Sequence, residues 1–285
     1  MARIRYVILD FDGTCTQVDR VQERFLAAYG KAIHADDKAW DKALATVRKA
    51  APHAGWTLAN APSTAPAGAD PFILAGEASA LLARARGGTA PDVFKAVYNS
   101  CVAPFRAELI DVLDALTKKV KVAFISNSGE TDIGNRLTDL LPAKLRAKIH
   151  VSGGAQKFLV KEPLLDSKLT ASERARFERL DAGLRVDGLP RPIYLRRGSY
   201  FEAMCDVYNR FGDASKSANK SIEHKLEETL VCGDIYELDL AMPAALGAQV
   251  HLIERAEPFP LYEYERARMG KGQISANLKA LIKRI

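Results

Sequence analysis

One stretch near the start of the chain decides the fold, Tyr6-Val7-Ile8-Leu9-Asp10-Phe11-Asp12-Gly13-Thr14-Cys15. Its first four residues are apolar and predict a short buried strand. Asp10 and Asp12 follow at the strand tip, and residues two apart on a strand point to the same side. Gly13 then permits a sharp turn. Paired buried acids are costly unless something compensates their charge. Because ligands of open α/β sheets bind at strand tips, this pair indicates a functional site and not a packing role.

The composition is typical of a soluble globular protein, with 285 residues, 48% hydrophobic and 27% charged. The net charge of +6 favours anionic partners, but the basic residues are spread along the chain, so nucleic acid is an unlikely partner. We expect no membrane association, because no apolar run approaches the ~20 residues of a membrane helix. The chain enters its first strand without a signal peptide, which favours a cytoplasmic location. The composition predicts no oligomeric state.

The cysteines show no paired spacing, which is typical of reduced thiols in a cytosolic protein. They are Cys15, Cys101, Cys205 and Cys232. Cys15 lies beside the two acids and could be a nucleophile, but no histidine lies near it in the sequence. We interpret it as a small residue next to the site.

Short apolar runs predict four core strands, over residues 6–9, 120–125, 229–231 and 249–253. Turn or helix signals follow these runs, which favours parallel strands joined by helices. Residues 149–151 and 193–195 are weaker strand candidates.

Residues from 19 to about 110 have apolar positions at helical spacing and no evident strand, so we expect a helical insertion there. Tyr29, Trp40 and Trp56 could line a site in it, although aromatics at this spacing usually form core. Residues 153–192 form a less regular excursion. Residues 274–285 place apolar side chains on one helical face, which predicts a helix docked on the body, with a membrane-surface helix as the alternative.

Two more strand tips carry polar residues. Ser126-Asn127-Ser128-Gly129 follows the second core strand, where a hydroxyl and backbone N–H groups can hold a phosphate. Gly233-Asp234 ends the third core strand, and Asp239 follows five residues later. Clustered carboxylates at strand tips suit a hard cation such as Mg²⁺, which prefers oxygen ligands.

In this order the motifs resemble the haloacid dehalogenase (HAD)-like superfamily of hydrolases, over residues 1–16 and 105–260. The resemblance implies an α/β fold with a Rossmann-like parallel sheet flanked by helices and an α-helical cap domain. It places the core in residues 1–16 and 105–285 and the cap in residues 17–104. Caps of the helical type are inserted between the first and second motifs, as here.

The chain departs from the family pattern at two motifs. The third motif is usually a lysine, and here the best match by spacing is Arg197, with Arg196, Lys157 and Lys161 as rivals. Arginine keeps the charge and can grip a phosphate with two donors, but it differs from lysine in reach and hydration. The fourth motif often has Asn before its last Asp, and here that residue is Leu238.

The resemblance implies phosphoryl transfer, with Asp10 as nucleophile and Asp12 as general acid and base. Mg²⁺ would lie between Asp10, the backbone carbonyl of Asp12 and Asp234, with Asp239 orienting the cation or its water. The predicted metal residues are thus Asp10, Asp12, Asp234 and Asp239, and the predicted phosphate-binding residues are Ser126, Asn127 and Arg197.

A carboxylate at Asp12 favours phosphatase over dehalogenase chemistry, because a dehalogenase needs no acid for its leaving group. The expected function is therefore Mg²⁺-dependent hydrolysis of a small phosphorylated metabolite. Alternatives are a phosphomutase, a phosphatase of nucleic-acid ends, and a non-catalytic binding protein that retains the fold.

Overall fold

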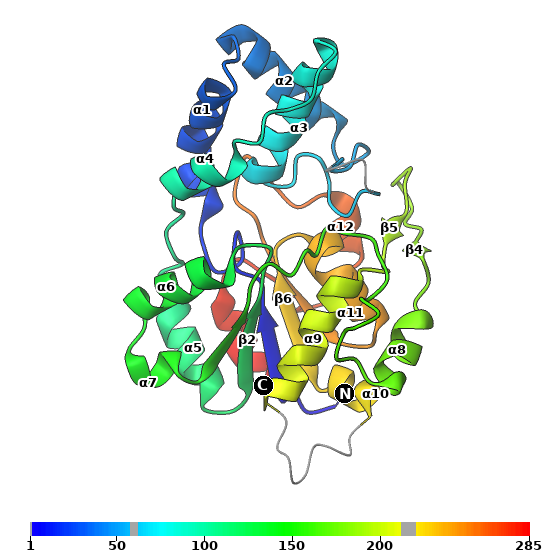
Figure 1. The fold of residues 1–285 in the computed structure, drawn as a ribbon. Helices are drawn as coiled ribbons and strands as arrows, with labels where there is room; N and C mark the ends of the chain where they lie inside the picture. Colours follow the sequence, from blue (N-terminus) through cyan, green and yellow to red (C-terminus); the bar gives the residue numbers. More distant parts are fainter. Residues whose placement is uncertain (1, 58–61, 212–220) are drawn as a thin grey trace.

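A computed structural model of the protein describes residues 2–57, 62–211 and 221–285. At its centre is a six-stranded sheet in the order β3-β2-β1-β6-β7-β8, with every neighbouring pair parallel (Figure 1). The strands are β1 (Tyr6–Leu9), β2 (Lys121–Ile125), β3 (Ile149–Ser152), β6 (Thr229–Gly233), β7 (Gln249–Ile253) and β8 (Ile274–Ser275). The four predicted core strands and the weaker candidate at 149–151 are confirmed. β8 was not predicted.

Helices cover both faces of the sheet, which explains why its strands are apolar on both sides. Val7 of β1 packs into one buried cluster and Ile8 into the other, as alternation along a strand requires. The Val7 side is formed by α5 (Leu109–Thr117), α6 (Glu130–Leu140), α7 (Ala143–Arg146) and η4 (Leu278–Arg284). The Ile8 side is formed by α8 (Ala171–Glu178), α9 (Gly198–Phe211), α10 (Ile222–Glu227), α11 (Ala241–Ala245) and α12 (Glu263–Ala267). The α/β class is confirmed.

A separate group of helices lies beyond the carboxyl ends of the strands (Figure 1). It comprises η1 (Val18–Val21), α1 (Gln22–Ala32), α2 (Asp37–Ala50), α3 (Pro71–Ala85) and α4 (Phe94–Ser100). These helices share a buried apolar cluster, which Phe259 from the loop after β7 also joins. The two connections to the sheet run side by side, because Thr16 and Phe105 form an antiparallel bridge. We call residues 17–104 the cap, and the division at these boundaries stays a prediction.

Two expected elements differ from the structure. The candidate strand at 193–195 is β5 (Ile193–Tyr194), which pairs antiparallel with β4 (Gly183–Leu184) outside the main sheet. The expected C-terminal helix is a short strand, β8, followed by the 3-10 helix η4. The segment does dock on the body, since Leu278 and Leu281 are buried against the α5 side of the sheet. Among the described residues, the helices are all too short or too polar to cross a membrane.

Candidate active site

Two neighbouring strands bring three carboxylates together. Asp10 directly follows β1 and Asp234 directly follows β6, and the Asp10 N–H donates to Cys232 O at 2.9 Å. Asp239 comes from η3 (Tyr236–Leu240), a π-helical turn, a form that is frequent at functional sites. Oxygens of Asp10, Asp234 and Asp239 all lie within 4.8 Å of one another. We call these residues the acid cluster.

The turn after β1 needs glycine at position 13. Gly13 has a φ of +79°, and a Cβ there would lie 2.4 Å from Asp234 Oδ2. The turn also delivers Thr14, whose hydroxyl lies 3.2 Å from Asp10 Oδ2 and 3.1 Å from Asp234 Oδ1. The single hydroxyl proton can therefore bridge two of the acids.

Lys157 is the cation of the site. Its ammonium donates to Asp10 Oδ1 at 2.5 Å and to Asp239 Oδ1 at 2.6 Å, and its side chain is 1% exposed. Burial alone would lower the pKa of Lys157, but the carboxylates of Asp10 and Asp239 raise it. Lys157 therefore stays charged at neutral pH and fixes the separation between the two acids.

Arg197, the cation that we expected from spacing, does not contact the acid cluster. Its Nη1 donates to the carbonyls of Leu238 at 2.6 Å and Lys157 at 3.3 Å. Its Nε and Nη2 have no partner among the described residues, and burial lowers the pKa of Arg197 to about 10. Arg197 thus supports the backbone behind the site, and the geometry favours Lys157 instead as the third-motif cation.

The other two rivals bind elsewhere. Arg196 Nε donates to Leu180 O at 2.9 Å, and Lys161 Nζ donates to Gln156 Oε1 at 3.1 Å. Leu238, which stands where the family often has Asn, is buried in an apolar cluster with Ile235 of the core and with cap residues. Leu238 therefore packs against the cap, where an Asn side chain would make a polar contact.

Asp12 lies outside the acid cluster and is held by hydroxyl groups. Ser128 Oγ donates to Asp12 Oδ2 at 2.5 Å. The Tyr98 hydroxyl, from cap helix α4, lies 3.0 Å from both Asp12 oxygens. Burial raises the pKa of Asp12, while these two hydrogen bonds oppose the shift. The sequence pointed to Ser128 only as part of the turn after the second core strand and did not point to Tyr98, so neither was predicted as a partner of Asp12.

The predicted phosphate-binding residues Ser126 and Asn127 occupy the tip of β2. Ser126 is 2% exposed, and its Oγ accepts from the Ser128 N–H at 3.2 Å. Asn127 Oδ1 accepts from the Lys157 N–H at 2.7 Å, so this side chain fixes the loop that carries Lys157. Both residues adjoin the site, and their contact with phosphate stays a prediction.

A buried ion pair braces the loop that carries Asp234. Arg255 Nη2 lies 2.5 Å from Glu265 Oε2, with 3% and 0% of the two side chains exposed. Arg255 also donates to the Asp234 carbonyl, and Glu265 Oε1 accepts from the Tyr236 N–H at 3.1 Å. Neither residue was predicted, because a supporting pair in the loop after β7 and in α12 has no motif of its own.

The charges of the acid cluster leave room for a divalent cation. With all three carboxylates ionised and Lys157 charged, the site would carry a net charge of −2, in a region where each acid is at most 8% exposed. Burial raises the pKa of Asp10 to about 7 and that of Asp234 well above its usual range, with the neighbouring acids adding to both shifts. An all-oxygen donor set with this excess charge fits Mg²⁺. The residues that could hold it are Asp10 and Asp234, with Asp239 beside them.

The cysteines, Tyr29 and Trp40 have ordinary structural roles, whereas Trp56 packs on Phe158, next to Lys157, with ring centroids 5.2 Å apart. Burial raises the pKa of the Cys15 thiol well above its usual range, so it is a poor nucleophile. All four cysteines are free and buried. Tyr29 and Trp40 stack with ring centroids 6.1 Å apart and belong to the cap core.

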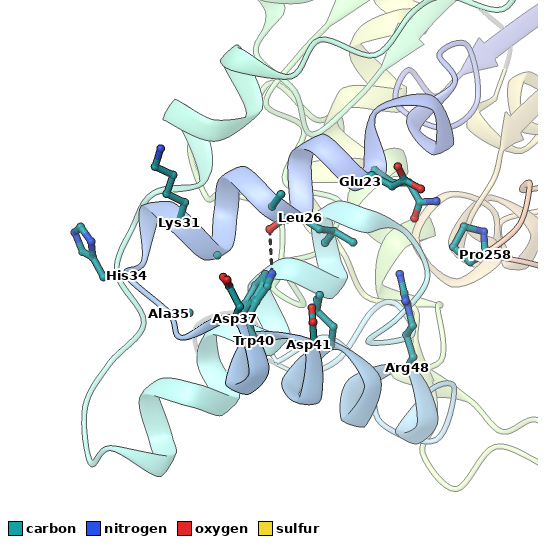
Figure 2. A pocket seen from close by; sticks show the side chains of 14 residues that line it. Glu23, Leu26, Lys31, His34, Ala35, Asp37, Trp40, Asp41, Arg48 and Pro258 are labelled. Carbon is teal, nitrogen blue, oxygen red and sulfur yellow. Dashed lines mark hydrogen bonds between the residues drawn. The ribbon is translucent and has the colours of Figure 1, made fainter.

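The cap carries a hollow of its own, about 1060 Å³, between α1 and α2 (Figure 2). Leu26, Trp40, Arg48 and Pro258 contribute to its lining, and Trp40 Nε1 donates to Leu26 O at 3.0 Å. None of the motif residues lines it. We assign it no role in the chemistry of the acid cluster.

Comparison with known proteins gives a match of fold and no match of sequence. No protein-family model and no curated protein sequence matches the chain. Among solved structures, a predicted phosphoglycolate phosphatase from Haemophilus somnus has a TM-score of 0.54 at 11% identity, over 99% of this chain and 98% of that one. The HAD-type hydrolase YfnB from Bacillus subtilis, solved with magnesium, has a TM-score of 0.51 at 12% identity over the same shares.

A third similar structure is the haloacid dehalogenase-like hydrolase SP0104 from Streptococcus pneumoniae. Its TM-score is 0.51 at 11% identity, over 99% of both chains. The similarity extends over nearly the whole chain, cap included. The protein therefore has the HAD-like fold, as the motifs predicted.

Proposed function

We propose that the protein is a magnesium-dependent phosphatase that hydrolyses the phosphate ester of a small metabolite. The observation that carries this proposal is the Asp10–Lys157–Asp239 chain, in which a single buried ammonium bridges two carboxylates at 2.5 and 2.6 Å. Such an arrangement orients one carboxylate and supplies positive charge where a phosphoryl group would bring negative charge.

The first half-reaction transfers the phosphoryl group to the chain. A carboxylate oxygen of Asp10 forms a bond to phosphorus while the bond to the ester oxygen breaks. Asp12 gives its proton to that leaving oxygen. Lys157 orients the Asp10 carboxylate, and Ser126 offers a hydroxyl to a phosphoryl oxygen.

The second half-reaction restores the enzyme. Water attacks phosphorus, Asp12 takes a proton from that water, and the bond between phosphorus and Asp10 breaks to release phosphate. When bound, Mg²⁺ supplies charge neutralisation, which lets an anionic phosphate approach an anionic nucleophile. Because Asp12 serves both halves of the reaction, its presence favours this chemistry over dehalogenation, which needs no acid for the leaving group.

The contacts of Lys157 also bear on the alternatives. A third motif without a lysine would favour a non-catalytic role, and the contacts of Lys157 with Asp10 and Asp239 argue against that role. No observation favours a phosphomutase or a nucleic-acid phosphatase over hydrolysis of a small ester.

The test is a screen of phosphate esters with and without Mg²⁺, with Asp10→Asn as a matched variant. We expect phosphate release by the wild type, loss of that release with a chelator, and a fall of at least about 10³-fold in Asp10→Asn, because the amide is a far weaker nucleophile. If the wild type releases phosphate from none of the esters, the proposal that the protein is a phosphatase is wrong. If Asp10→Asn is as active as the wild type, the assignment of Asp10 as the nucleophile is wrong. Oligonucleotides with terminal phosphates belong in the screen, since preference for them would favour the nucleic-acid alternative.

A further inference from the structure

One side chain of the cap reaches the group proposed as general acid. The Tyr98 hydroxyl lies 3.0 Å from each oxygen of Asp12 and 3.1 Å from Ser128 Oγ. Tyr98 is on α4 and the other two residues are on the core, so this triangle closes only when cap and core meet. The two hydroxyls occupy hydrogen-bonding positions around a carboxylate that would otherwise be free to rotate.

The cap holds the Tyr98 ring firmly. The ring stacks on Phe94 at a centroid distance of 5.7 Å and meets Phe72 edge-on at 5.3 Å. An ionised carboxylate can only accept hydrogen bonds, so the Tyr98 hydroxyl is the donor in its contacts with both Asp12 oxygens. The ring is therefore a fixed support that presents one O–H to Asp12.

We propose that Tyr98 is a positioning residue through which the closed cap aims Asp12 at the leaving oxygen, so that the enzyme is suited to phosphate esters of unactivated alcohols. This inference rests on the proposed phosphatase function and specifies its substrate class. An alkoxide is a poor leaving group and departs only when an acid protonates it in the transition state. A nitrophenolate departs without that help, so its ester gains little from a well-aimed Asp12.

The test compares Tyr98→Phe with the wild type on two esters, an alkyl phosphate chosen from the substrate screen and p-nitrophenyl phosphate. Removal of one oxygen leaves the ring and its packing in place. We expect kcat/KM for the alkyl ester to fall about 10- to 100-fold, because protonation of its leaving oxygen depends on a well-aimed Asp12. On p-nitrophenyl phosphate we expect kcat/KM within about threefold of the wild type, because kcat/KM covers only the first half-reaction and excludes the later step in which Asp12 activates water.

Tyr29→Phe is the matched control. Tyr29 is also a cap tyrosine, but it is buried in the cap core at 4% exposure, and among the described residues Asp12 accepts from Tyr98 and Ser128 instead. We expect it to leave both esters unaffected. Equal losses on the two esters in Tyr98→Phe would show a general structural defect and overturn the inference.

A double-mutant cycle provides the second measurement and needs only the alkyl ester. If Tyr98 acts through Asp12, adding Tyr98→Phe to Asp12→Asn costs nothing further, whereas an independent role gives additive losses and overturns the inference. Failure of the inference is distinct from failure of the phosphatase proposal. The phosphatase proposal fails when the wild type releases no phosphate. The inference about Tyr98 fails when the wild type is active but Tyr98→Phe changes the activity on the two esters by the same factor.

Discussion

Lys157 is the residue on which the electrostatics of the site depend most. Among the residues that the structure describes, its ammonium is the one cation placed directly between carboxylates of the acid cluster, at 2.5 Å from Asp10 and 2.6 Å from Asp239. Removing it would leave like charges facing one another without water to screen them. The residue therefore has both a structural task and, in the proposed reaction, a catalytic one.

We expect Lys157→Ala to lower kcat by at least about 100-fold, because a charge aimed at the phosphoryl oxygens is lost. Lys157→Arg should recover little of this, since a planar guanidinium cannot replace a compact ammonium between two acids. Arg197→Lys is the comparison. It alters hydrogen bonds to two carbonyls, so we expect a loss of about 1–3 kcal/mol in stability and a smaller loss of kcat. Steady-state kinetics measures kcat, and urea unfolding measures stability. A larger loss of kcat in Arg197→Lys than in Lys157→Ala would show that Arg197, and not Lys157, is the third-motif cation.

The acids could be predicted from the sequence, whereas Lys157 could be named only as one of four candidates for the cation. Asp10, Asp234 and Asp239 follow apolar runs, and the tips of parallel strands converge by geometry alone. Lys157 lies in an irregular loop after β3, and its approach to Asp10 depends on packing that no local pattern encodes. Spacing favoured Arg197 because α9 begins next to it, but a correct element boundary does not determine where a long side chain points.

At the scale of elements, a buried ion pair supports the loop after β6 in addition to the loop's own hydrogen bonds, such as that from the Ile235 N–H to Asp239 Oδ2 at 3.0 Å. Arg255 and Glu265 contact the backbone on both sides of Ile235, at Asp234 and at Tyr236. A buried pair of this kind is costly to break from one side, because the remaining charge stays buried without a partner.

We expect Glu265→Gln to destabilise the protein by about 3 kcal/mol for that reason. The same change should weaken the apparent affinity for Mg²⁺ about tenfold, because the support behind Asp234 loosens. Glu254→Gln is the control, since the Arg266–Glu254 pair at 2.8 Å has side chains 49% and 36% exposed, and we expect less than about 0.5 kcal/mol there. Denaturant unfolding measures the change in stability, and titration of activity with Mg²⁺ measures the change in apparent affinity. Equal effects of Glu265→Gln and Glu254→Gln would contradict the special role of the buried pair.

The ends of the sheet show the limit of pattern analysis for short elements. β8 has two residues, and η4 winds as a 3-10 helix although its apolar spacing suggested an α-helix. Both are fixed by docking, through Leu278 and Leu281 on one side and the Leu252–Ile274 pairing on the other. The longer cap helices were predictable because their periodicity persists over several turns.

For the molecule as a whole, cap and core meet through apolar and polar contacts around the acids. Ala65, Ala69 and Ile73 of the cap share a buried cluster with Ile235 and Leu238 of the fourth motif. Arg191 holds Glu237 in a bidentate pair and donates to the cap carbonyl of Pro52 at 3.3 Å. The bounds of the insertion stay a prediction from the sequence. These contacts could not be predicted, because they join residues far apart in the chain and have no local signature.

Global stability should depend on pH through His251, which lies on β7 and is fully buried. Its Nε2 lies 2.7 Å from Ser275 Oγ of β8, and its Nδ1 lies 3.4 Å from the Arg284 guanidinium of η4. Burial, and then the positive charge of Arg284, lower the pKa of His251 from 6.5 to about 4. Between these two values the unfolded chain binds a proton at this residue and the folded chain does not. Stability from this group is therefore complete above pH 6.5 and is lost as the pH falls toward 4.

We expect the free energy of unfolding to fall by about 1–2 kcal/mol between pH 7 and pH 5 because of His251 alone. The contribution is measured as the difference in pH dependence between the wild type and His251→Gln, which cannot be protonated in this range. His53→Gln is the control, because His53 is exposed in the cap and makes no comparable buried contact in the described part of the chain. Urea unfolding at pH 5, 6 and 7 should give a flatter profile for His251→Gln and an unchanged one for His53→Gln. If the free energy of unfolding of His251→Gln depends on pH as steeply as that of the wild type, groups other than His251 cause the loss of stability at low pH. The packing of β8 and η4 against β7 then does not depend on the charge of His251.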